Sequence, residues 1–420
     1  MKYIISAILL FLMPYSLSAQ PYIDVMAAPY RATCNGTADD TISIQKAIDA
    51  AQSTGITIYI PKTANGCRVT GALKITSSVK ITGAGTMPYR GAPRGESSRG
   101  PGSWIYFDHT GAGFLISSGL GNPISGVLIT DIGTRRNQPS PGSGSGVFAP
   151  CECDYDFKIE DADVELDNVT ALNPTRLAYV DNMSVVRLIL NNLRSQPFKE
   201  GINIHRAYEV VRMNGVSFWP YWADLQNVNN YTVDNRKSLW FFRVDNPQIS
   251  NFFSIFDHNC VVFDHASDGS GGNGITSRFQ GQNIGCDQSV VGVVATPAAK
   301  YTTAQFSNFY VMQPQRWTAP APNVLIEAGD TSIDFVNARF SDATANALIA
   351  SANAGTRISI TNGWADNWNR ANGGHAAFYA GMGSAITIFP PPHVSGGNGA
   401  ATFSGGGKKI QGTVSSVDKE

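Results

Sequence analysis

Side chains that can exchange protons occur at similar places in successive segments of the middle of the chain. Glu200 and Asp224 are two carboxylic acids, and Asp257-His258 places a third beside an imidazole. Two carboxyl groups about 5 Å apart can cleave a glycosidic bond with retention, and roughly 6.5–9.5 Å leads to inversion. We therefore interpret Glu200 and Asp224 as acid and base or nucleophile, supported by Asp257 and His258. The alternative is two surface carboxylates and a hydrogen-bonded structural turn.

Residues suited to holding a sugar accompany this set, namely Arg176, Lys199, Trp219, Tyr221 and Trp222. The aromatic side chains would offer apolar faces to pyranose rings, or would pack beneath a loop. In a β-elimination, Arg176, Lys199 or His258 would instead be the base. A cation or hydrogen bonds would then neutralise a uronate carboxylate. The pattern therefore allows hydrolysis and elimination.

A second set of reactive side chains follows short apolar runs in the same region. Asp181, His205 and Asp264 stand at the same place in their segments. If these segments stack as coils, Asp181 and His205 are neighbours, and Asp181 lies roughly 14 Å from Asp264. Two carboxylates so far apart cannot hydrolyse a glycosidic bond together. We interpret this set as substrate-binding or structural.

The elements that must position these residues come from a repeated phrase: an apolar residue, a small or polar residue, then Asn, Gly or Asp. The phrase recurs nine times, with third positions at Asp131, Asn168, Asn192, Gly215, Asn251, Asn283, Asn308, Asn337 and Asn362. A second apolar residue usually precedes the first by two positions, which is the period of a strand. Asn tolerates a left-handed turn, and stacked Asn amides can bond one another along a column. Repeats of this length predict a solenoid, here a parallel β-helix.

The coil repeat explains how residues distant in sequence could form one site. Adjacent coils lie roughly 4.8 Å apart, so residues at equal offsets from the turn meet on neighbouring coils. Counted from Asn192 and Gly215, Glu200 and Asp224 lie at similar offsets. We therefore expect these two carboxylates to face each other across one coil step.

An amphipathic helix is expected near the start of the chain, over about 40–54. Ile44, Ala47, Ile48 and Ala51 fall on one helical face, and Gly55 follows as a stop signal. Such a helix would cap the open end of the solenoid, which is otherwise an exposed strand edge.

The same N-terminal region resembles a known family. The matching residues are Gly36, Ala38-Asp39-Asp40-Thr41, Ile44-Gln45, Ala47-Ile48, Ile58-Tyr59-Ile60-Pro61 and Val79-Lys80-Ile81-Thr82-Gly83-Ala84-Gly85. Over about residues 24–86 they are similar to the pectate-lyase-like, rhamnogalacturonase/epimerase-like superfamily. The resemblance implies an all-β fold, a right-handed single-stranded parallel β-helix (pectin-lyase-like) with an N-terminal capping α-helix. The superfamily includes lyases, hydrolases, epimerases, binding proteins and phage tailspike depolymerases, so it predicts fold better than function.

Composition suggests the domain boundaries. Residues 1–19 have the charged start, apolar stretch and small-residue end of a signal peptide, which predicts a secreted or periplasmic protein. The β-helix is expected over 20–389, with loop-rich insertions at about 86–125 and 133–150. A Gly/Pro-rich tail is expected over 390–420. The six cysteines indicate disulfides in an exported chain, with Cys34–Cys67 pinning the cap and Cys260–Cys286 tying neighbouring coils.

Charge and hydropathy limit the classes of partner. The chain has 31 basic and 32 acidic residues, so no basic field favours nucleic acid. No segment after the signal is long and apolar enough to span a membrane. We expect a polysaccharide partner, no cofactor and no metal, with calcium as an exception if the protein is a lyase. Assembly into a homotrimer stays open.

These patterns together predict an exported carbohydrate-active enzyme that cleaves glycosidic bonds, preferably by hydrolysis with paired carboxylates. The first alternative is a polysaccharide lyase acting on uronate glycans by β-elimination. The second is a non-catalytic glycan-binding or tailspike-like surface protein. The set of four polygalacturonase motifs, Asn-Thr-Asp, Asp-Asp, Gly-His-Gly and Arg-Ile-Lys, is not present intact.

Overall fold

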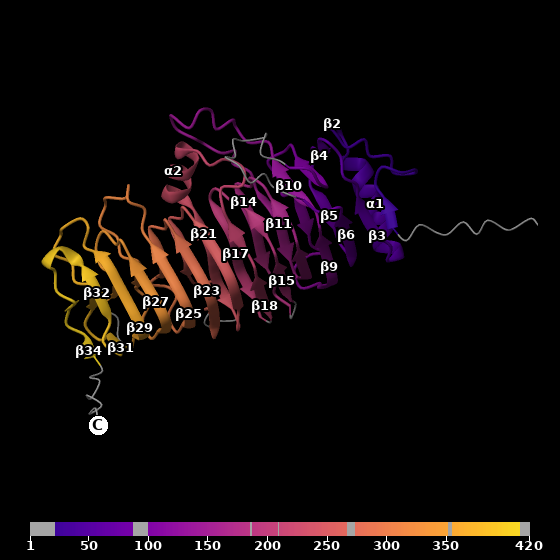
Figure 1. Ribbon diagram of the computed structural model, residues 1–420. Helices are drawn as coiled ribbons and strands as arrows, with labels where there is room; N and C mark the ends of the chain where they lie inside the picture. The colour runs from indigo at the N-terminus through magenta and orange to yellow at the C-terminus, as the bar shows by residue number, and fades with distance from the viewer. Residues whose placement is uncertain are drawn as a thin grey trace, which may run out of the picture.

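The computed structural model describes residues 22–86, 100–184, 187–208, 210–266, 274–351 and 355–411. Within these ranges nearly all regular structure is strand, and the strands stack side by side along an elongated solenoid (Figure 1). The ladders between named strands are parallel, as between β17 and β20 or β21 and β23. The structure thus confirms the all-β parallel β-helix. The predicted signal peptide, residues 1–19, lies outside the described residues.

The described strands form two sheets. Sheet B takes one strand from each coil: β5 (Leu73–Ile75), β8 (Phe114–Ile116), β11 (Tyr155–Glu160), β14 (Arg176–Asp181), β17 (Glu200–Ala207), β20 (Lys237–Val244), β22 (Asn259–Phe263), β24 (Val291–Ala295), β26 (Val324–Ile326), β28 (Leu348–Ala350), β30 (Phe378–Ala380) and β33 (Phe403–Ser404). Sheet A is longer and bends at the turns of the repeat: β1 (Tyr22–Asp24), β2 (Asn35–Asp39), β3 (Thr57–Ile60), β4 (Gly66–Val69), β6 (Val79–Gly83), β7 (Trp104–Phe107), β9 (Ile124–Thr130), β10 (Gly133–Arg136), β12 (Ala162–Asp167), β13 (Thr170–Ala171), β15 (Leu188–Asn191), β16 (Arg194–Ser195), β18 (Val211–Asn214), β19 (Ser217–Phe218), β21 (Gln248–Ile255), β23 (Phe279–Asp287), β25 (Thr303–Met312), β27 (Ser332–Ser341), β29 (Arg357–Trp368), β31 (Ala385–Phe389), β32 (His393–Gly396) and β34 (Lys408–Gln411).

The Asn residues of the repeat form the predicted column at the bend of sheet A. Nδ2 of Asn283 donates to Oδ1 of Asn251 at 3.0 Å, and the same bond follows from Asn308 to Asn283 at 2.9 Å. Asn337 and Asn362 continue it at 3.2 and 2.8 Å. These residues have left-handed φ values of 53–59°, which Asn tolerates better than most side chains. The turn residue therefore sets the backbone and also joins the coils.

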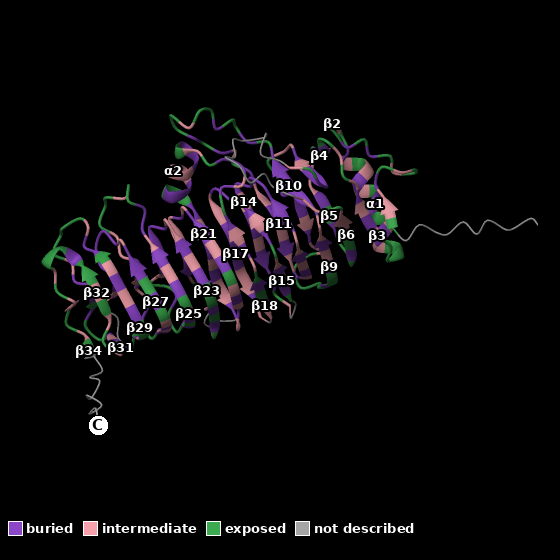
Figure 2. Ribbon diagram, in the orientation of Figure 1, coloured by how far each residue is buried: buried purple, intermediate pink, exposed green. Residues whose placement is uncertain are grey.

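The core of the solenoid follows the two-residue alternation of the strands. Figure 2 shows buried positions alternating along the strands with positions of intermediate exposure. Phe279, Phe306 and Phe335 from successive coils stack inside, with ring centroids 5.0 and 5.1 Å apart. Because each coil repeats this inward row, one continuous core runs through the solenoid.

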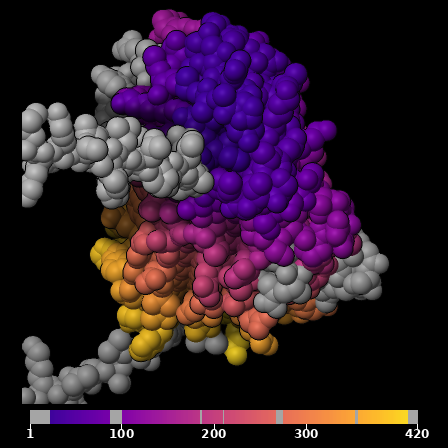
Figure 3. Space-filling view, turned by 90° about the vertical axis from the view of Figure 1, so that its right-hand side faces the viewer, coloured from indigo at the N-terminus to yellow at the C-terminus, as the bar shows by residue number. Residues whose placement is uncertain are grey.

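The predicted capping helix is confirmed as α1 (Thr41–Thr54). It buries Ile44, Ala47, Ile48 and Ala51, and Gly55 ends it in the left-handed conformation. Seen from the N-terminal end, the indigo residues of the cap and first coils occupy the upper part of the face, above residues of later coils (Figure 3). The helix therefore covers the first strands that would otherwise be an open end.

Several segments expected as loops or tail contain strands. β7, β8 and β9 lie within 100–125 or run through its end, and β10 lies within 133–150. β32 and β34 pair in parallel with β29 and β31, so sheet A continues beyond residue 389. Short apolar runs such as Trp104–Phe107 are flanked by Gly and Ser, which masks their strand character in the sequence. The remaining part of the first insertion, 87–99, lies outside the described residues.

Three disulfides and one further helix complete the fold. Cys34–Cys67 and Cys260–Cys286 join neighbouring coils as expected, and Cys151–Cys153 closes a small ring. Helix α2 (Gln226–Asn235) is inserted between β19 and β20 and projects at one edge of the stack (Figure 1). Its buried Val228 packs with Trp222, Phe198 and Phe148.

Candidate functional site

The predicted pair of carboxylates is not formed as expected. Glu200 begins β17, and its register partners on the two adjacent coils are Arg176 and Lys237. Asp224 lies just before α2, is exposed, and accepts a hydrogen bond from Asn229 at 2.9 Å. The inserted helix lengthens this coil, so equal offsets from the turn no longer mark neighbouring positions. Lys237, rather than Asp224, therefore stands beside Glu200.

Asp257 is structural in its surroundings. Its carboxylate is fully buried and pairs with the equally buried Arg236 at 2.7 Å. Hydroxyl groups of Ser238, Ser254 and Ser289 also donate to it. A carboxylate so enclosed cannot reach a polysaccharide. The offset of Asp257 from its repeat turn does not reveal that the side chain points inward.

The other predicted residues near α2 are dispersed. Nδ1 of His258 donates to the carbonyl of Val233 at 3.1 Å, and the imidazole lies against the ring of Trp317. Trp222 is buried in the cluster beneath α2, so it cannot form the predicted sugar platform. Tyr221 is half-buried and donates to Ser217 at 3.2 Å.

Trp219 keeps the exposure expected of a binding residue, since 44% of it is accessible. Its ring lies 5.9 Å from Phe253 of β21. Trp219 directly follows β19 and Phe253 lies in β21, both strands of sheet A, whereas Glu200 belongs to sheet B. Trp219 therefore does not form one site with Glu200.

Glu200 is held by a network on the outer face of sheet B. The Tyr155 hydroxyl and Nδ2 of Asn203 both donate to its Oε2, the latter at 3.0 Å. Nε of Arg176 donates to Oε1 at 3.2 Å. Burial, together with the negative charge of Glu200, raises the pKa of Tyr155. The phenol therefore stays protonated and remains a donor to the carboxylate.

The small disulfide ring adds an acidic wall beside this network. Nη1 of Arg176 donates to the carbonyl of Cys153 at 2.8 Å, and Nη2 lies 3.4 Å from Glu152. Glu152 also forms an ion pair with Lys199 and is 68% exposed. The hydrogen bond from Lys199 and the charge of the two cations lower the pKa of Glu152. Arg176 and Lys199 thus share one exposed carboxylate.

The second predicted set comes together more closely than the first. Asp181 ends β14 and accepts from Nε and Nη2 of Arg206, the latter at 2.8 Å. Nδ1 of His205 lies 3.5 Å from Oδ1 of Asp181. Burial would raise the pKa of Asp181, but the nearby His205 imidazole and the hydrogen bonds from Arg206 lower it to about 2. The carboxylate is therefore ionised and lies beside the imidazole, whose buried Nδ1 has no closer hydrogen-bond partner among the described residues.

A β-bulge explains how His205 and Arg206 both reach Asp181. The register between β14 and β17 shifts after Val180–Ile204, so Asp181 pairs with Arg206 and His205 is the additional residue. Bulges re-aim side chains at sites of this kind. The sequence places His205 and Asp181 on neighbouring coils, and the structure agrees, although the bulge is invisible in the repeat.

Five rings extend from these residues along the outer face of sheet B, and we call them the aromatic row: Tyr155, Tyr179, His205, Phe242 and Trp240. Successive centroids are 5.4, 6.2, 5.3 and 4.8 Å apart. Nζ of Lys237 lies 3.4 Å from the Trp240 ring, and burial lowers the pKa of this lysine. The row continues over four neighbouring strands, from β11 to β20.

Asp264 closes the site beyond Trp240. It accepts from Thr296 at 2.8 Å and from Nε1 of Trp240 at 3.4 Å. Three coil steps separate β14, which carries Asp181, from β22, which directly precedes Asp264. The two strands are therefore roughly 14 Å apart, as predicted. Asp264 can therefore bind a ligand on the aromatic row but cannot pair with Asp181.

Metal ligation receives no support from the described residues. The one group with suitable spacing there is Cys34, Asp40 and Cys67, and its two thiols form a disulfide. Calcium dependence stays a prediction.

Sequence reasoning missed Tyr155, Tyr179, Arg206, Trp240 and Phe242. Each lies on an outward position of a sheet-B strand, next to the apolar residues that point inward. The two-residue alternation was therefore a signal for Tyr179 and Trp240. Their alignment across coils depended on insertion lengths that the sequence does not give.

Comparisons with known proteins support the fold. No family model matches the sequence, and no curated protein is significantly similar to it. The Agl-KA catalytic domain superposes with a TM-score of 0.58 at 15% identity, over 94% of this chain and 69% of that chain. Pre-mature gene product 12 of bacteriophage phi29 gives 0.57 at 13% identity, over 90% of this chain and 53% of its own. The present chain thus spans about half of that phage protein.

At these identities the similarity concerns the fold. The parallel β-helix that the N-terminal resemblance implied is confirmed. Within the described residues no helix is long and apolar enough to cross a bilayer.

Proposed function

We propose that the protein is an exported carbohydrate-active enzyme that cleaves a polysaccharide bound along the outer face of sheet B. The observation that carries this proposal is His205, whose Nδ1 lies 3.5 Å from the ionised Asp181 within a continuous aromatic row. Aromatic faces suit the apolar faces of sugar rings, and a base oriented by a carboxylate suits proton transfer. Sugar units would stack on Tyr179 and Trp240, with His205 between them.

The geometry favours β-elimination on a uronate glycan. Nδ1 of His205 faces Asp181, so Nε2 is the nitrogen that would take the C5 proton of the uronate. The electron pair forms the C4–C5 double bond as the bond from C4 to the glycosidic oxygen breaks. Burial and the neighbouring Asp181 raise the pKa of Tyr179 to about 12, so its hydroxyl is the acid that protonates the leaving oxygen. Asp181 stabilises the imidazolium that results.

Cations beside Tyr179 suit an acidic substrate. Lys158 is the register partner of Tyr179 on the adjacent coil, and Nζ of Lys158 lies 3.9 Å from Glu160, so it is only loosely held. Arg206 is engaged by Asp181 but remains at the same strand end. A uronate carboxylate next to Lys158 would have its charge neutralised, which makes the C5 proton easier to remove.

Hydrolysis stays a second candidate because of one specific pair. Glu160 and Asp181 are register partners on adjacent coils, so their backbones lie roughly 4.8 Å apart. That spacing lies within reach of the carboxyl separations that glycosidases use. In this mechanism Asp181 is the ionised group and Glu160 the acid, in place of the predicted Glu200 and Asp224.

One assay separates the two chemistries. The protein is incubated with polygalacturonate, alginate and neutral polysaccharides, and new reducing ends and ultraviolet absorbance of unsaturated ends are measured together. Elimination gives both signals on a uronate polymer and none after His205→Ala. Reducing ends without unsaturated ends would assign hydrolysis, and Glu160→Gln would then abolish them. No cleavage of any polymer, together with retained binding, would identify a glycan-binding protein and refute the enzymatic proposal.

A further inference from the structure

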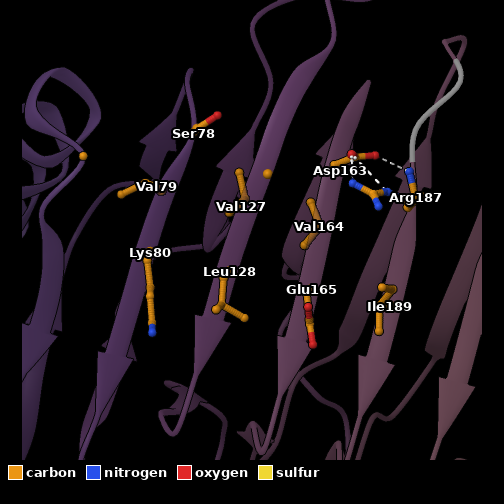
Figure 4. Close-up of a pocket in the computed structure, with 12 residues that line it drawn as sticks. Ser78, Val79, Lys80, Val127, Leu128, Asp163, Val164, Glu165, Arg187 and Ile189 are labelled. Carbon is orange, nitrogen blue, oxygen red and sulfur yellow. Dashed lines mark hydrogen bonds and ion pairs between the residues drawn. The ribbon is translucent and has the colours of Figure 1, made fainter.

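A long groove lies on sheet A, away from the aromatic row, and we call it the sheet-A groove. It consists of two adjoining hollows of about 380 and 680 Å³ that share Glu165 and Ile189. Figure 4 shows the first hollow, in which Lys80, Leu128 and Glu165 project from neighbouring strands. None of the residues that we assign to cleavage lines this groove.

The floor of the groove is one outward row of side chains in strict register. It runs along the solenoid through eight strands: Lys80, Leu128, Glu165, Ile189, Arg212, Gln248, Gln280 and Gln305. A second polar row runs beside it: Asp167, Asn191, Asn214, Ser250, Gln282 and Ser307. Successive side chains in each row are therefore separated by one coil step, roughly 4.8 Å.

Several of these polar groups have no partner within the described part of the chain. Arg212, Gln248, Gln282 and Gln305 line the groove, and their side chains make none of the hydrogen bonds or ion pairs found among the described residues. By contrast, Asn214 accepts from Ser250 at 3.0 Å, so the second row is partly satisfied internally. The side-chain amides of the three glutamines each carry hydrogen-bond donors and an acceptor. They can therefore bond to hydroxyl groups, which also donate and accept.

The charge of the groove favours an uncharged ligand. At the rim, Asp163 and Arg187 neutralise each other through an ion pair of 2.9 Å, which Figure 4 marks. On the floor, Glu165 lies between the cations Lys80 and Arg212, and the C-terminal half carries amides and hydroxyls. Leu128 and Ile189 add an apolar strip. This mixture suits neither a nucleic acid nor a strongly acidic polymer.

We propose that the sheet-A groove binds a neutral polysaccharide that lies along the solenoid axis. A hexose unit extends over about one coil step, so successive sugars would meet equivalent amides on successive strands. Gln248, Gln280 and Gln305 would bond hydroxyl groups, and Ile189 would contact an apolar sugar face. This site goes beyond the proposed cleavage site, because it holds polymer on another sheet and does no chemistry.

The test is affinity electrophoresis in gels that contain galactomannan, xyloglucan or dextran, with polygalacturonate as the acidic counterpart. The full chain should be retarded by at least one neutral polymer. The variant Arg212→Ala/Gln248→Ala/Gln305→Ala should bind about tenfold more weakly, since it loses several hydrogen bonds. The matched control Ser359→Ala/Thr361→Ala changes the same two rows outside the groove and should bind like the wild type.

The outcomes separate this proposal from the cleavage mechanism. Circular dichroism and thermal melting check that the triple variant is folded, and Arg212→Ala alone serves if it is not. Cleavage of short uronate oligosaccharides should be equal in wild type and groove variants, because these ligands need only sheet B. Retardation that is absent in the wild type, or unchanged in the folded variants, overturns the groove proposal. Self-association that the variants abolish in sedimentation would assign the groove to a second copy and also overturn it.

Discussion

Replacement of Asp181 by Asn tests the electrostatic basis of the site. The carboxylate has a pKa of about 2 in the folded protein, compared with an ordinary value of 3.8. Each pKa unit corresponds to about 1.36 kcal/mol, so ionised Asp181 stabilises the fold by about 2 kcal/mol. Asn keeps the shape of the side chain but loses the charge that Arg206 and His205 contact.

The sign of the pH dependence follows from the lowered pKa. The contribution of Asp181 is complete above about pH 4 and is lost as the pH falls through about 2. Urea unfolding of wild type and variant should therefore differ by about 2 kcal/mol at about pH 6, and the difference should shrink toward zero near pH 2. Asp224→Asn, which changes an exposed carboxylate, should differ by less than about 0.5 kcal/mol at any pH.

Two results would refute this reasoning. A difference of equal size at every pH would mean that the cost arises from packing rather than from charge. No difference near neutral pH would mean that Arg206 and His205 do not stabilise the carboxylate. Either result would also weaken the assignment of His205 as a base, because that role depends on an ionised Asp181.

Four further predictions concern single positions. His205→Ala should lower the rate of polymer cleavage by about 10²–10⁴-fold and leave polymer binding in electrophoresis nearly unchanged. A smaller loss of rate would exclude a catalytic imidazole. Asp257→Asn should lower the free energy of unfolding by roughly 3–5 kcal/mol, because it leaves Arg236 buried and unpaired, and an unaltered stability would contradict the buried ion pair. Glu152→Gln should strengthen binding of oligogalacturonate by up to about fivefold in titration calorimetry, since it frees cations from an exposed pair, and weaker binding would count against this. Asn308→Ala should lower the free energy of unfolding in urea by about 2 kcal/mol. Asn308→Gly should lower it by less, because glycine tolerates the left-handed turn. Equal losses would show that the backbone conformation at this position does not matter.

The repeat predicted the architecture because its signals are local. An Asn at each turn and apolar residues two positions apart are sufficient to predict stacked strands, and the amide column from Asn251 to Asn362 follows from stacking. The capping helix was predictable for a similar reason, since Ile44 and Ile48 share one face. These features depend on spacings of a few residues.

The site depended on longer spacings and was predicted only in part. Asp181 lies on sheet B beside His205 as expected, but α2 displaces Asp224 from the register, so Lys237 stands beside Glu200 instead. Asp257 comes after its repeat turn at a spacing similar to that of its predicted partners. Its side chain nevertheless points into the solenoid, where it pairs with Arg236. The length of each insertion and the direction of each side chain at a bend of the solenoid decide which residues meet. A single sequence does not give either of them.

The amide column has a direction. From Asn283 to Asn362 every Nδ2 points back toward the preceding coil, and Asn251 likewise donates to Asn214 at 2.9 Å. The side-chain dipoles are therefore aligned head to tail, and each bond polarises the next one, as in other chains of hydrogen bonds. The solenoid thus carries an electrical polarity along one corner, positive toward its cap and negative toward its far end. Replacement of an Asn at the centre of the column would leave two shorter and weaker stacks of amides. Replacement of the last one, Asn362, would leave the other hydrogen bonds in place.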